Sequence, residues 1–287
     1  MTSAHEILAA LAGHTPGGYL TGGLPASEPT AWAALALVRA GETEAARRAT
    51  DWLAEIQQRD GSVGVNAKES TPAWPTSLAM LAWHAVSPTD YSDNLAAAIN
   101  WALAARGRTT SRKRQIGHDT TLVGWSWAAN THSWLEPTAM FVRALRTVGQ
   151  SDHPRTTEAV RLLVDRLLPS GGANYGNTLV LGQELLPHVQ PSGVVLWALE
   201  GLSIDDQRVQ RSADYLLQNL GPATTAASLA YGVLGLSAVG RRPYEADEWL
   251  RAAAERELAG RPSFYKLALL SLAMSGASIG IAAAGLP

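Results

Sequence analysis

The sequence contains no cysteine. Disulfides, thiolate zinc ligands and a thiol nucleophile are therefore excluded, which fits a reducing compartment. Charged residues are also few, at 17% of the chain, and 23 basic residues nearly balance 25 acidic ones. The formal net charge of −2 gives no general attraction for nucleic acid, so we expect no nucleic-acid partner.

A basic segment followed by a long apolar core is missing from residues 1–13. We therefore expect no signal peptide and a cytoplasmic protein. Residues 267–287 carry no charge and meet the length rule for a membrane span, but their second half is mostly Gly, Ser and Ala. We expect a helix followed by an apolar tail over 276–287. The sequence leaves open whether this tail packs internally or makes a peripheral membrane contact.

Alternating β-branched runs are scarce, and two kinds of helical segment alternate along the chain. The first kind is apolar all round and has a proline near its start, which suits the first turn of an interior helix. These segments cover residues 28–41, 74–86, 136–149, 190–202, 221–240 and 261–276. The second kind is amphipathic and covers residues 3–13, 43–60, 92–107, 155–171, 205–221 and 244–260.

Strict alternation of six interior and six amphipathic helices predicts an all-α (α/α)6 barrel or toroid. We expect residues 1–287 to form a single domain of this kind. The repeat length varies from about 30 to 60 residues, so the repeat is degenerate. The N-termini of the inner helices should gather at one end of the barrel, which we call the mouth.

One amphipathic segment ends in WLAEIQQRDGSV, residues 52–63, with Gln57 and Gly61 four residues apart. This pattern resembles the QW repeat of squalene–hopene cyclases and the related turns of protein prenyltransferase β subunits, which share the α/α toroid. A second copy, residues 162–173, keeps Leu163 and Gly171 but has Leu167 in place of Gln. The resemblance implies a single-domain, bacterial-type member of this superfamily.

The catalytic motifs of those families are missing. The sequence has neither Asp-x-Asp-Asp nor Asp-Asp-x-x-Asp, and it has no cysteine for the zinc site of the prenyltransferases. The seven histidines show no paired metal-ligand spacing. We therefore expect no metal and no other cofactor. The basic cluster RGRTTSRKR, residues 106–114, is interpreted as a solvated loop or as a contact for an anion or a lipid headgroup.

The segment GWSWAANTHSWLEPTA, residues 124–139, holds three of the ten tryptophans at a spacing that no regular element would require. It is predicted to be a loop that leads into a helix at Pro137 and forms the wall and lid of a pocket at the mouth. The predicted substrate-binding residues are Trp74, Trp125, Trp127, Trp134, Tyr175 and His188. In the alternative interpretation the tryptophans plug the end of the barrel.

Acid-initiated chemistry needs a carboxylic acid that stays protonated in an apolar site. The candidate catalytic residues are Asp119 and Glu136, which flank the tryptophans, with His132 to orient one of them. The alternative for Asp119 is a loop turn. For Glu136 the alternative is the favourable helix dipole, because Glu28-Pro29-Thr30 is the same element in another repeat.

Three functions fit these features: the first below is the predicted one, the second is its alternative, and the third ranks last because it needs two carboxylates at a defined separation. The first is a toroid that resembles terpenoid cyclases or prenyltransferases, binds a hydrophobic isoprenoid in the barrel and performs acid-initiated cyclisation or a related lyase or isomerase reaction. The second is a non-catalytic toroid that binds a lipid, a peptide or a protein. The third is a carbohydrate-active (α/α)6 hydrolase or lyase with paired carboxylates, such as Asp119 and Glu136. The sequence does not determine whether the chain is an enzyme, which substrate it takes or its oligomeric state.

Overall fold

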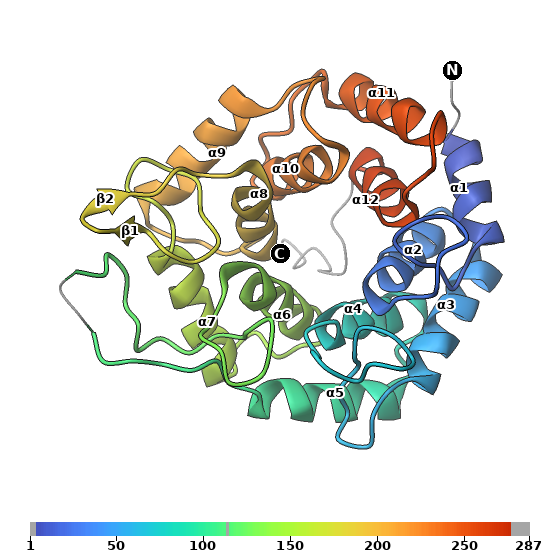
Figure 1. The fold of residues 1–287 in the computed structure, drawn as a ribbon, viewed down its shortest axis with the longest axis horizontal. Helices are drawn as coiled ribbons and strands as arrows, with labels where there is room; N and C mark the ends of the chain where they lie inside the picture. Colours follow the sequence, from blue (N-terminus) through green and yellow to red (C-terminus); the bar gives the residue numbers. More distant parts are fainter. Residues whose placement is uncertain (1–3, 113–114, 277–287) are drawn as a thin grey trace, which may run out of the picture.

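The computed structural model describes residues 4–112 and 115–276. In this part of the chain twelve α-helices form two concentric rings, with only a two-stranded hairpin besides (Figure 1). The all-α toroid predicted from the sequence is confirmed. The predicted apolar tail lies outside the described residues, apart from its first residue, Gly276.

The inner ring contains the helices that were expected to lie inside. They are α2 (Ser27–Arg39), α4 (Thr76–Val86), α6 (Leu135–Thr147), α8 (Val189–Ala198), α10 (Ala226–Ala238) and α12 (Phe264–Met274). The outer ring contains α1 (Ala4–Gly13), α3 (Thr43–Glu55), α5 (Ser92–Ala104), α7 (Pro154–Asp165), α9 (Gln207–Asn219) and α11 (Ala246–Leu258). Successive inner helices pack on one another, and α12 packs on α2, which closes the ring.

Two inner helices begin later than their sequence pattern indicates. The pattern starts at Gly221 and Arg261, whereas α10 begins at Ala226 and α12 at Phe264. In both cases the proline lies in the preceding turn rather than in the helix, because the chain first has to cross from the outer to the inner ring. The hairpin of β1 (Leu179–Val180) and β2 (Gln183–Glu184) belongs to the loop between α7 and α8.

A hydroxyl side chain holds the loop before each of four inner helices in place. The hydroxyl lies in the first turn or two of the inner helix. Its oxygen accepts a hydrogen bond from a backbone N–H in the loop that leads from the outer to the inner ring. The pairs are Thr30 with Gly17 (3.1 Å), Thr76 with Val63 (2.8 Å), Thr138 with Trp125 (3.0 Å) and Ser192 with Ala173 (2.8 Å). We call these four contacts the hydroxyl anchors. Three of them join residues 13 apart in the chain.

The segment that resembles a QW repeat connects neighbouring outer helices. The Gln57 side-chain amide donates to the carbonyls of Gly61 (2.9 Å) and of Asn94 (3.0 Å) in α5. Gly61 has φ +93°, and a Cβ there would lie 2.2 Å from the carbonyl oxygen of Ala97. A glycine is therefore required at this close approach. Gly171 plays the same part against Arg211 in α9, with φ +103°.

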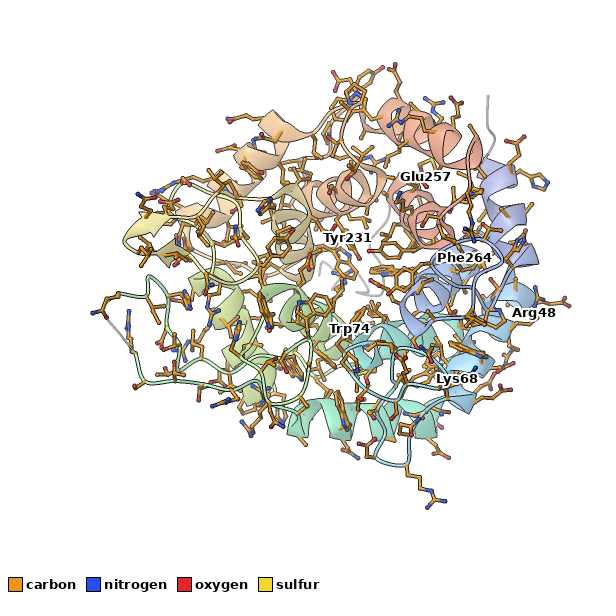
Figure 2. All side chains as sticks on the ribbon, viewed as in Figure 1. Arg48, Lys68, Trp74, Tyr231, Glu257 and Phe264 are labelled. Atoms are coloured by element: carbon orange, nitrogen blue, oxygen red, sulfur yellow. The ribbon has the colours of Figure 1, made fainter. Side chains whose placement is uncertain are left out.

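No described helix is long and apolar enough to cross a membrane. Aromatic side chains pack against one another inside the inner ring of helices. Trp32 of α2 meets Trp197 of the opposite helix α8 at 5.7 Å and Tyr231 of α10 at 5.9 Å between ring centroids. All three are at most 2% exposed, and Figure 2 shows Tyr231 directed toward the middle of the ring. Side chains therefore occupy the interior of the barrel where these three aromatic residues meet.

Candidate active site at the mouth of the barrel

The residue before the proline holds the same place at the start of four successive inner helices. It is Glu28 in α2, Trp74 ahead of α4, Glu136 in α6 and Gln190 in α8. The hydroxyl anchor two residues later holds each of these helix starts in the same register. The inner-helix starts gather at the mouth, so two carboxyls, an indole and an amide come from the same end of the barrel.

Glu28 is the most perturbed acid of the site. Its carboxylate accepts a hydrogen bond from the Tyr19 hydroxyl at 2.6 Å. Burial raises the pKa of Glu28 to about 7; hydrogen bonding from Tyr19 and Tyr265 acts in the opposite direction, and the charge of Glu136 raises the pKa further. A carboxyl with this pKa is protonated in a large fraction of molecules near neutral pH, so it can donate a proton.

Glu136 is the second carboxyl of the pair. It is 7% exposed and accepts a hydrogen bond from the Gln190 amide at 3.0 Å. Burial raises its pKa as well, and the Gln190 hydrogen bond partly offsets this effect. The charge of Glu136 contributes to the raised pKa of Glu28, so the two carboxyls interact electrostatically although they come from α2 and α6.

Three tyrosines continue the hydrogen-bonding surface from Glu28 into the barrel. The rings of Tyr19 and Tyr265 meet edge to face at 5.8 Å between centroids, and the hydroxyls of Tyr265 and Tyr231 lie 3.3 Å apart. Burial raises the pKa of each of these phenols, so they remain protonated donors at neutral pH. Beneath them, the indole N–H groups of Trp32 and Trp197 have no hydrogen-bond partner within the described residues.

A cavity of about 600 Å³ opens beside Trp74. The indoles of Trp74 and Trp127 meet edge to face at 4.8 Å between centroids and form part of its wall. Trp101, Trp125 and Phe141 add aromatic surface, and polar groups come from Gln58, Asp60, Arg106 and Asn130. Three of the tryptophans predicted to bind substrate therefore line one cavity, next to the mouth.

Trp125 is also a core residue. It is 2% exposed, its indole N–H donates to the Ala102 carbonyl at 2.9 Å, and its ring stacks on Phe141 at 4.9 Å. The Arg155 guanidinium lies 4.5 Å from the ring centroid. The hydroxyl anchor between Trp125 and Thr138 places Trp125 at the position that Val63 and Ala173 occupy in other repeats. The QW families have tryptophan at this position. Trp125 joins the outer ring to α6.

The structure does not bring Asp119 together with Glu136. Asp119 lies in the loop between α5 and α6 and accepts hydrogen bonds from the N–H (2.9 Å) and hydroxyl (2.6 Å) of Thr121. These bonds lower its pKa, so it is an ionised loop-turn residue. Its own N–H donates to Asp165 at 2.8 Å, which places it at the outer ring. The carboxyl that the charge of Glu136 does affect is Glu28.

The other predicted site residues form two aromatic contacts at the starts of α6 and α8. The exposed His132 ring lies against the half-buried Trp134 at 4.4 Å between centroids. Tyr175, which is 44% exposed, lies 5.2 Å from His188. Trp134 and His188 are the N-cap residues of α6 and α8. Within residues 4–112 and 115–276, no group of three His, Asp or Glu side chains is placed to hold a metal ion.

Several residues of the site were not selected from the sequence. In the sequence, the position of Glu28 is explained by the favourable helix dipole. The signal for a shared role was that Glu28 and Glu136 belong to the same Glu-Pro-Thr element in two repeats. Tyr231 and Tyr265 are aromatic residues within aliphatic helices, which is a weak signal for any site. Tyr19 reaches the site from the loop after α1, and ring closure brings it next to Tyr265.

No protein-family model matches the sequence, and no curated protein sequence matches it. Solved structures do match. A glycosidase variant in complex with glucose is 12% identical, with a TM-score of 0.62 over 95% of this chain and 95% of its own. A variant of the type II terpene cyclase MstE from Scytonema, in complex with its substrate geranylgeranyl dihydroxybenzoate, is 13% identical, with a TM-score of 0.62 over 97% and 98%.

An α-amylase from Clostridium perfringens is 11% identical, with a TM-score of 0.57 over 88% of this chain and 85% of its own. Identities this low establish the fold and not the reaction. The chain is thus an (α/α)6 toroid of the kind shared by terpene cyclases and glycosidases, as the sequence resemblance implied. The choice between their chemistries depends on its own mouth residues.

Proposed function

We propose that the protein is a glycoside-cleaving enzyme, with Glu28 as general acid and Glu136 as the second catalytic carboxylate. The observation that carries the proposal is the coupled pair itself. Two carboxyls at equivalent inner-helix starts interact through their charges, and burial raises the pKa of Glu28 to about 7. Glycoside hydrolysis requires a protonated acid and an ionised partner on either side of the bond that breaks.

The shape and polarity of the mouth support a sugar. Phenol hydroxyls of Tyr19 and Tyr265 and the Gln190 amide offer hydrogen bonds to a hydroxylated ring. Trp74, which precedes the helix between those of the two glutamates, offers an aromatic face of the kind on which sugars stack. The Trp32–Trp197 contact at 5.7 Å fills the barrel below, which favours a ring at the mouth over a long chain through the centre. One structural neighbour was solved with glucose.

The reaction would begin when Glu28 transfers its proton to the glycosidic oxygen as the bond from that oxygen to the anomeric carbon breaks. Glu136, as a carboxylate, would either attack the anomeric carbon or remove a proton from an attacking water. In both cases one water is consumed and its OH ends on the sugar. If Glu136 attacks directly, the ionised Glu28 takes the remaining proton of the water that cleaves the sugar from Glu136, which restores the acid. If Glu136 activates the water, Glu136 takes that proton, and exchange with solvent returns Glu136 to a carboxylate and Glu28 to an acid. The Gln190 amide would keep the carboxylate oxygen of Glu136 in place.

The test uses 4-nitrophenyl α- and β-glucosides and short glucose oligomers with wild type, Glu28→Gln and Glu136→Gln. General acid catalysis contributes about 10²–10⁴-fold, so each variant should lose at least about a hundredfold in kcat/KM. Glu44→Gln is the matched control, because Glu44 is an exposed acid in the first turn of α3. The anomeric form of the first product, read by proton NMR, separates direct attack by Glu136 from attack by water.

No turnover of these compounds, together with no binding of glucose, would contradict the sugar assignment. Equal activity in wild type and in both site variants would also contradict it. Turnover retained with an unchanged pH profile in Glu28→Gln would exclude Glu28 as the acid.

A second candidate, the binding of an isoprenoid, is favoured by the cavity beside Trp74. Its volume of about 600 Å³ and its wall of five aromatic side chains are those of a site for an apolar molecule, since such sites usually measure about 300–1,000 Å³. The raised pKa of Glu28 would equally suit protonation of an alkene, and aromatic faces can stabilise the resulting cation.

Fluorescence titration with farnesol and squalene tests this candidate. Trp127→Ala should weaken binding, because Trp127 lines the cavity, whereas Trp134→Ala should not, because Trp134 lies against His132 outside the cavity wall. Absence of any response in the wild type would rule the candidate out. Binding without turnover, in wild type and variants alike, would indicate a non-catalytic toroid.

A further inference from the structure

A second cavity, of about 540 Å³, lies away from the carboxyl pair, between the end of α7 and the loop that leads to α6. Its wall contains four side chains that carry or can carry positive charge: Arg108, His118, His132 and Arg166. Hydroxyl and amide groups complete it, from Thr110, Thr120, Thr131, Ser133, Asn130 and Asn177. No acidic side chain belongs to this wall among the described residues. We call it the basic cavity.

Arg166 is the central residue of the basic cavity. It is 4% exposed, and its Nη1 donates a hydrogen bond to the Gly176 carbonyl at 2.7 Å. Within the described part of the chain Nε has no hydrogen-bond partner; its nearest charge is Asp165 Oδ2 at 3.7 Å. Burial lowers the pKa of Arg166 to about 10. A buried guanidinium with unused N–H groups is costly unless a partner satisfies it.

His118 adds a second buried and unsatisfied group. It is 5% exposed, and its Nδ1 has no hydrogen-bond partner within the described residues. Burial, followed by the charge of Arg166, lowers the pKa of His118 to about 4. The same two causes lower the pKa of His132. Arg108 lies next to His132, because the two backbones form a parallel β-bridge. The backbone N–H of Arg108 also donates a hydrogen bond to the Thr131 carbonyl at 2.8 Å.

The nearby carboxylates do not occupy the basic cavity. Asp165 and Asp119 act on Arg166 and His118 through their charge, but both line a neighbouring groove on the outer side, with Arg112, Arg161 and Arg208. One face of the cationic cluster is therefore balanced by protein carboxylates, while the face toward the basic cavity has none.

We propose that the basic cavity binds a phosphate or diphosphate group, with Arg166 as the central ligand and Arg108, His118 and His132 around it. A guanidinium presents paired N–H donors that match the oxygens of a phosphate. The threonine hydroxyls and the Asn177 amide supply further donors, and the protonation of His118 on binding would add a positive charge. This site uses no residue of the Glu28–Glu136 pair, so the proposal does not depend on the glycosidase assignment.

The shared chemistry is a terminal phosphate, which a phosphorylated sugar or a prenyl diphosphate could carry. Calorimetric titration with inorganic pyrophosphate tests the site itself. Parallel titrations with glucose 1-phosphate and farnesyl diphosphate distinguish the two sources, because the ester whose organic part also contacts the protein binds more tightly than pyrophosphate.

The decisive variant is Arg108→Gln, because Arg108 is exposed and its replacement leaves the buried groups intact. A charge-assisted hydrogen bond corresponds to about tenfold or more in affinity, so pyrophosphate should bind about tenfold more weakly to this variant. Arg166→Lys should lose at least as much, because it keeps a charge but not the paired donors. Arg112→Gln is the matched control, since it removes a charge from the same loop but outside the basic cavity.

Histidine NMR gives a readout that does not depend on affinity. Pyrophosphate should raise the pKa of His118 by one unit or more, and His118→Asn identifies that signal by its loss. Absence of saturable pyrophosphate binding would overturn the proposal. So would equal weakening by Arg112→Gln and Arg108→Gln, which would indicate only general attraction to basic surface.

Discussion

The raised pKa of Glu28 predicts an unusual dependence of stability on pH. Its folded-state pKa of about 7 lies above its ordinary value of 4.5, so the folded protein binds a proton that the unfolded chain has already released. Below about pH 4.5 the Glu28 carboxyl is protonated in both the folded and the unfolded state, so its burial does not lower the free energy of unfolding through charge. The cost grows as the pH rises from 4.5 to 7 and is complete above 7, where a carboxylate must stay buried.

The size of this effect follows from the two pKa values. They differ by about 2.5 pH units, and each unit corresponds to about 1.4 kcal/mol, so the buried charge costs up to about 3–4 kcal/mol. Partial exposure of Glu28 makes this an upper limit. Replacing Glu28 by Gln removes the charge, so Glu28→Gln should be more stable relative to wild type at about pH 8.5 than at about pH 5, by as much as this amount.

Urea unfolding followed by circular dichroism at the two pH values measures the difference. Glutamine keeps a side-chain oxygen that can accept the Tyr19 hydrogen bond, and Gln itself does not titrate, so the pH dependence of the stability difference reports the proton on Glu28. Glu44→Gln should show no such dependence, because Glu44 is exposed. A stability difference between wild type and Glu28→Gln that is the same at both pH values would refute the reasoning.

Three further predictions concern the scaffold. Gly61→Ala should destabilise the fold by several kcal/mol, because its Cβ would lie 2.2 Å from the Ala97 carbonyl oxygen at φ +93°; a thermal midpoint within a degree or two of wild type would contradict this. Thr138→Val should cost about 1–3 kcal/mol in denaturant unfolding, because it leaves the buried N–H of Trp125 without its acceptor, whereas Thr43→Val, at an exposed hydroxyl, should cost little. Trp125→Ala should cost about 3–5 kcal/mol and weaken folding rather than ligand binding alone; a variant of unchanged stability would mean that the ring is not part of the core.

The fold could be predicted because its evidence is local. Each inner helix shows apolar residues all round and a proline near its start, and each outer helix shows one apolar face, so alternation alone indicates two rings. The starts of α10 and α12 were the weakest part of the prediction. There the proline belongs to the turn that carries the chain inward, and no local pattern distinguishes such a turn from a helix N-terminus.

The candidate site was only partly predictable, because it is assembled across the ring. Glu136 could be selected from its tryptophan neighbours, but its coupling to Glu28 depends on the curvature of three successive inner helices. The contact between Tyr19 and Tyr265 needs the ring to close, and no sequence pattern reports that closure.

Trp125 illustrates a second limit. Its irregular spacing from Trp127 and Trp134 correctly indicates a loop, but a loop residue can still be buried. The distance of 13 residues from Trp125 to Thr138, repeated between Val63 and Thr76, was the signal that distinguishes it from its neighbours. It becomes interpretable only once the hydroxyl anchors are seen.

The hydroxyl anchors fix where an inner helix starts without fixing the length of the loop before it. In three repeats the anchored residues are 13 apart, yet between Ala173 and Ser192 the separation is 19, and the β1–β2 hairpin occupies the longer loop. Gln190 still meets Glu136 at 3.0 Å, so the extra residues have not displaced the helix start. Loops between an anchored residue and its helix can therefore be exchanged or lengthened without moving the helix start, so the surface around the mouth can change while Glu136 and Gln190 stay in place.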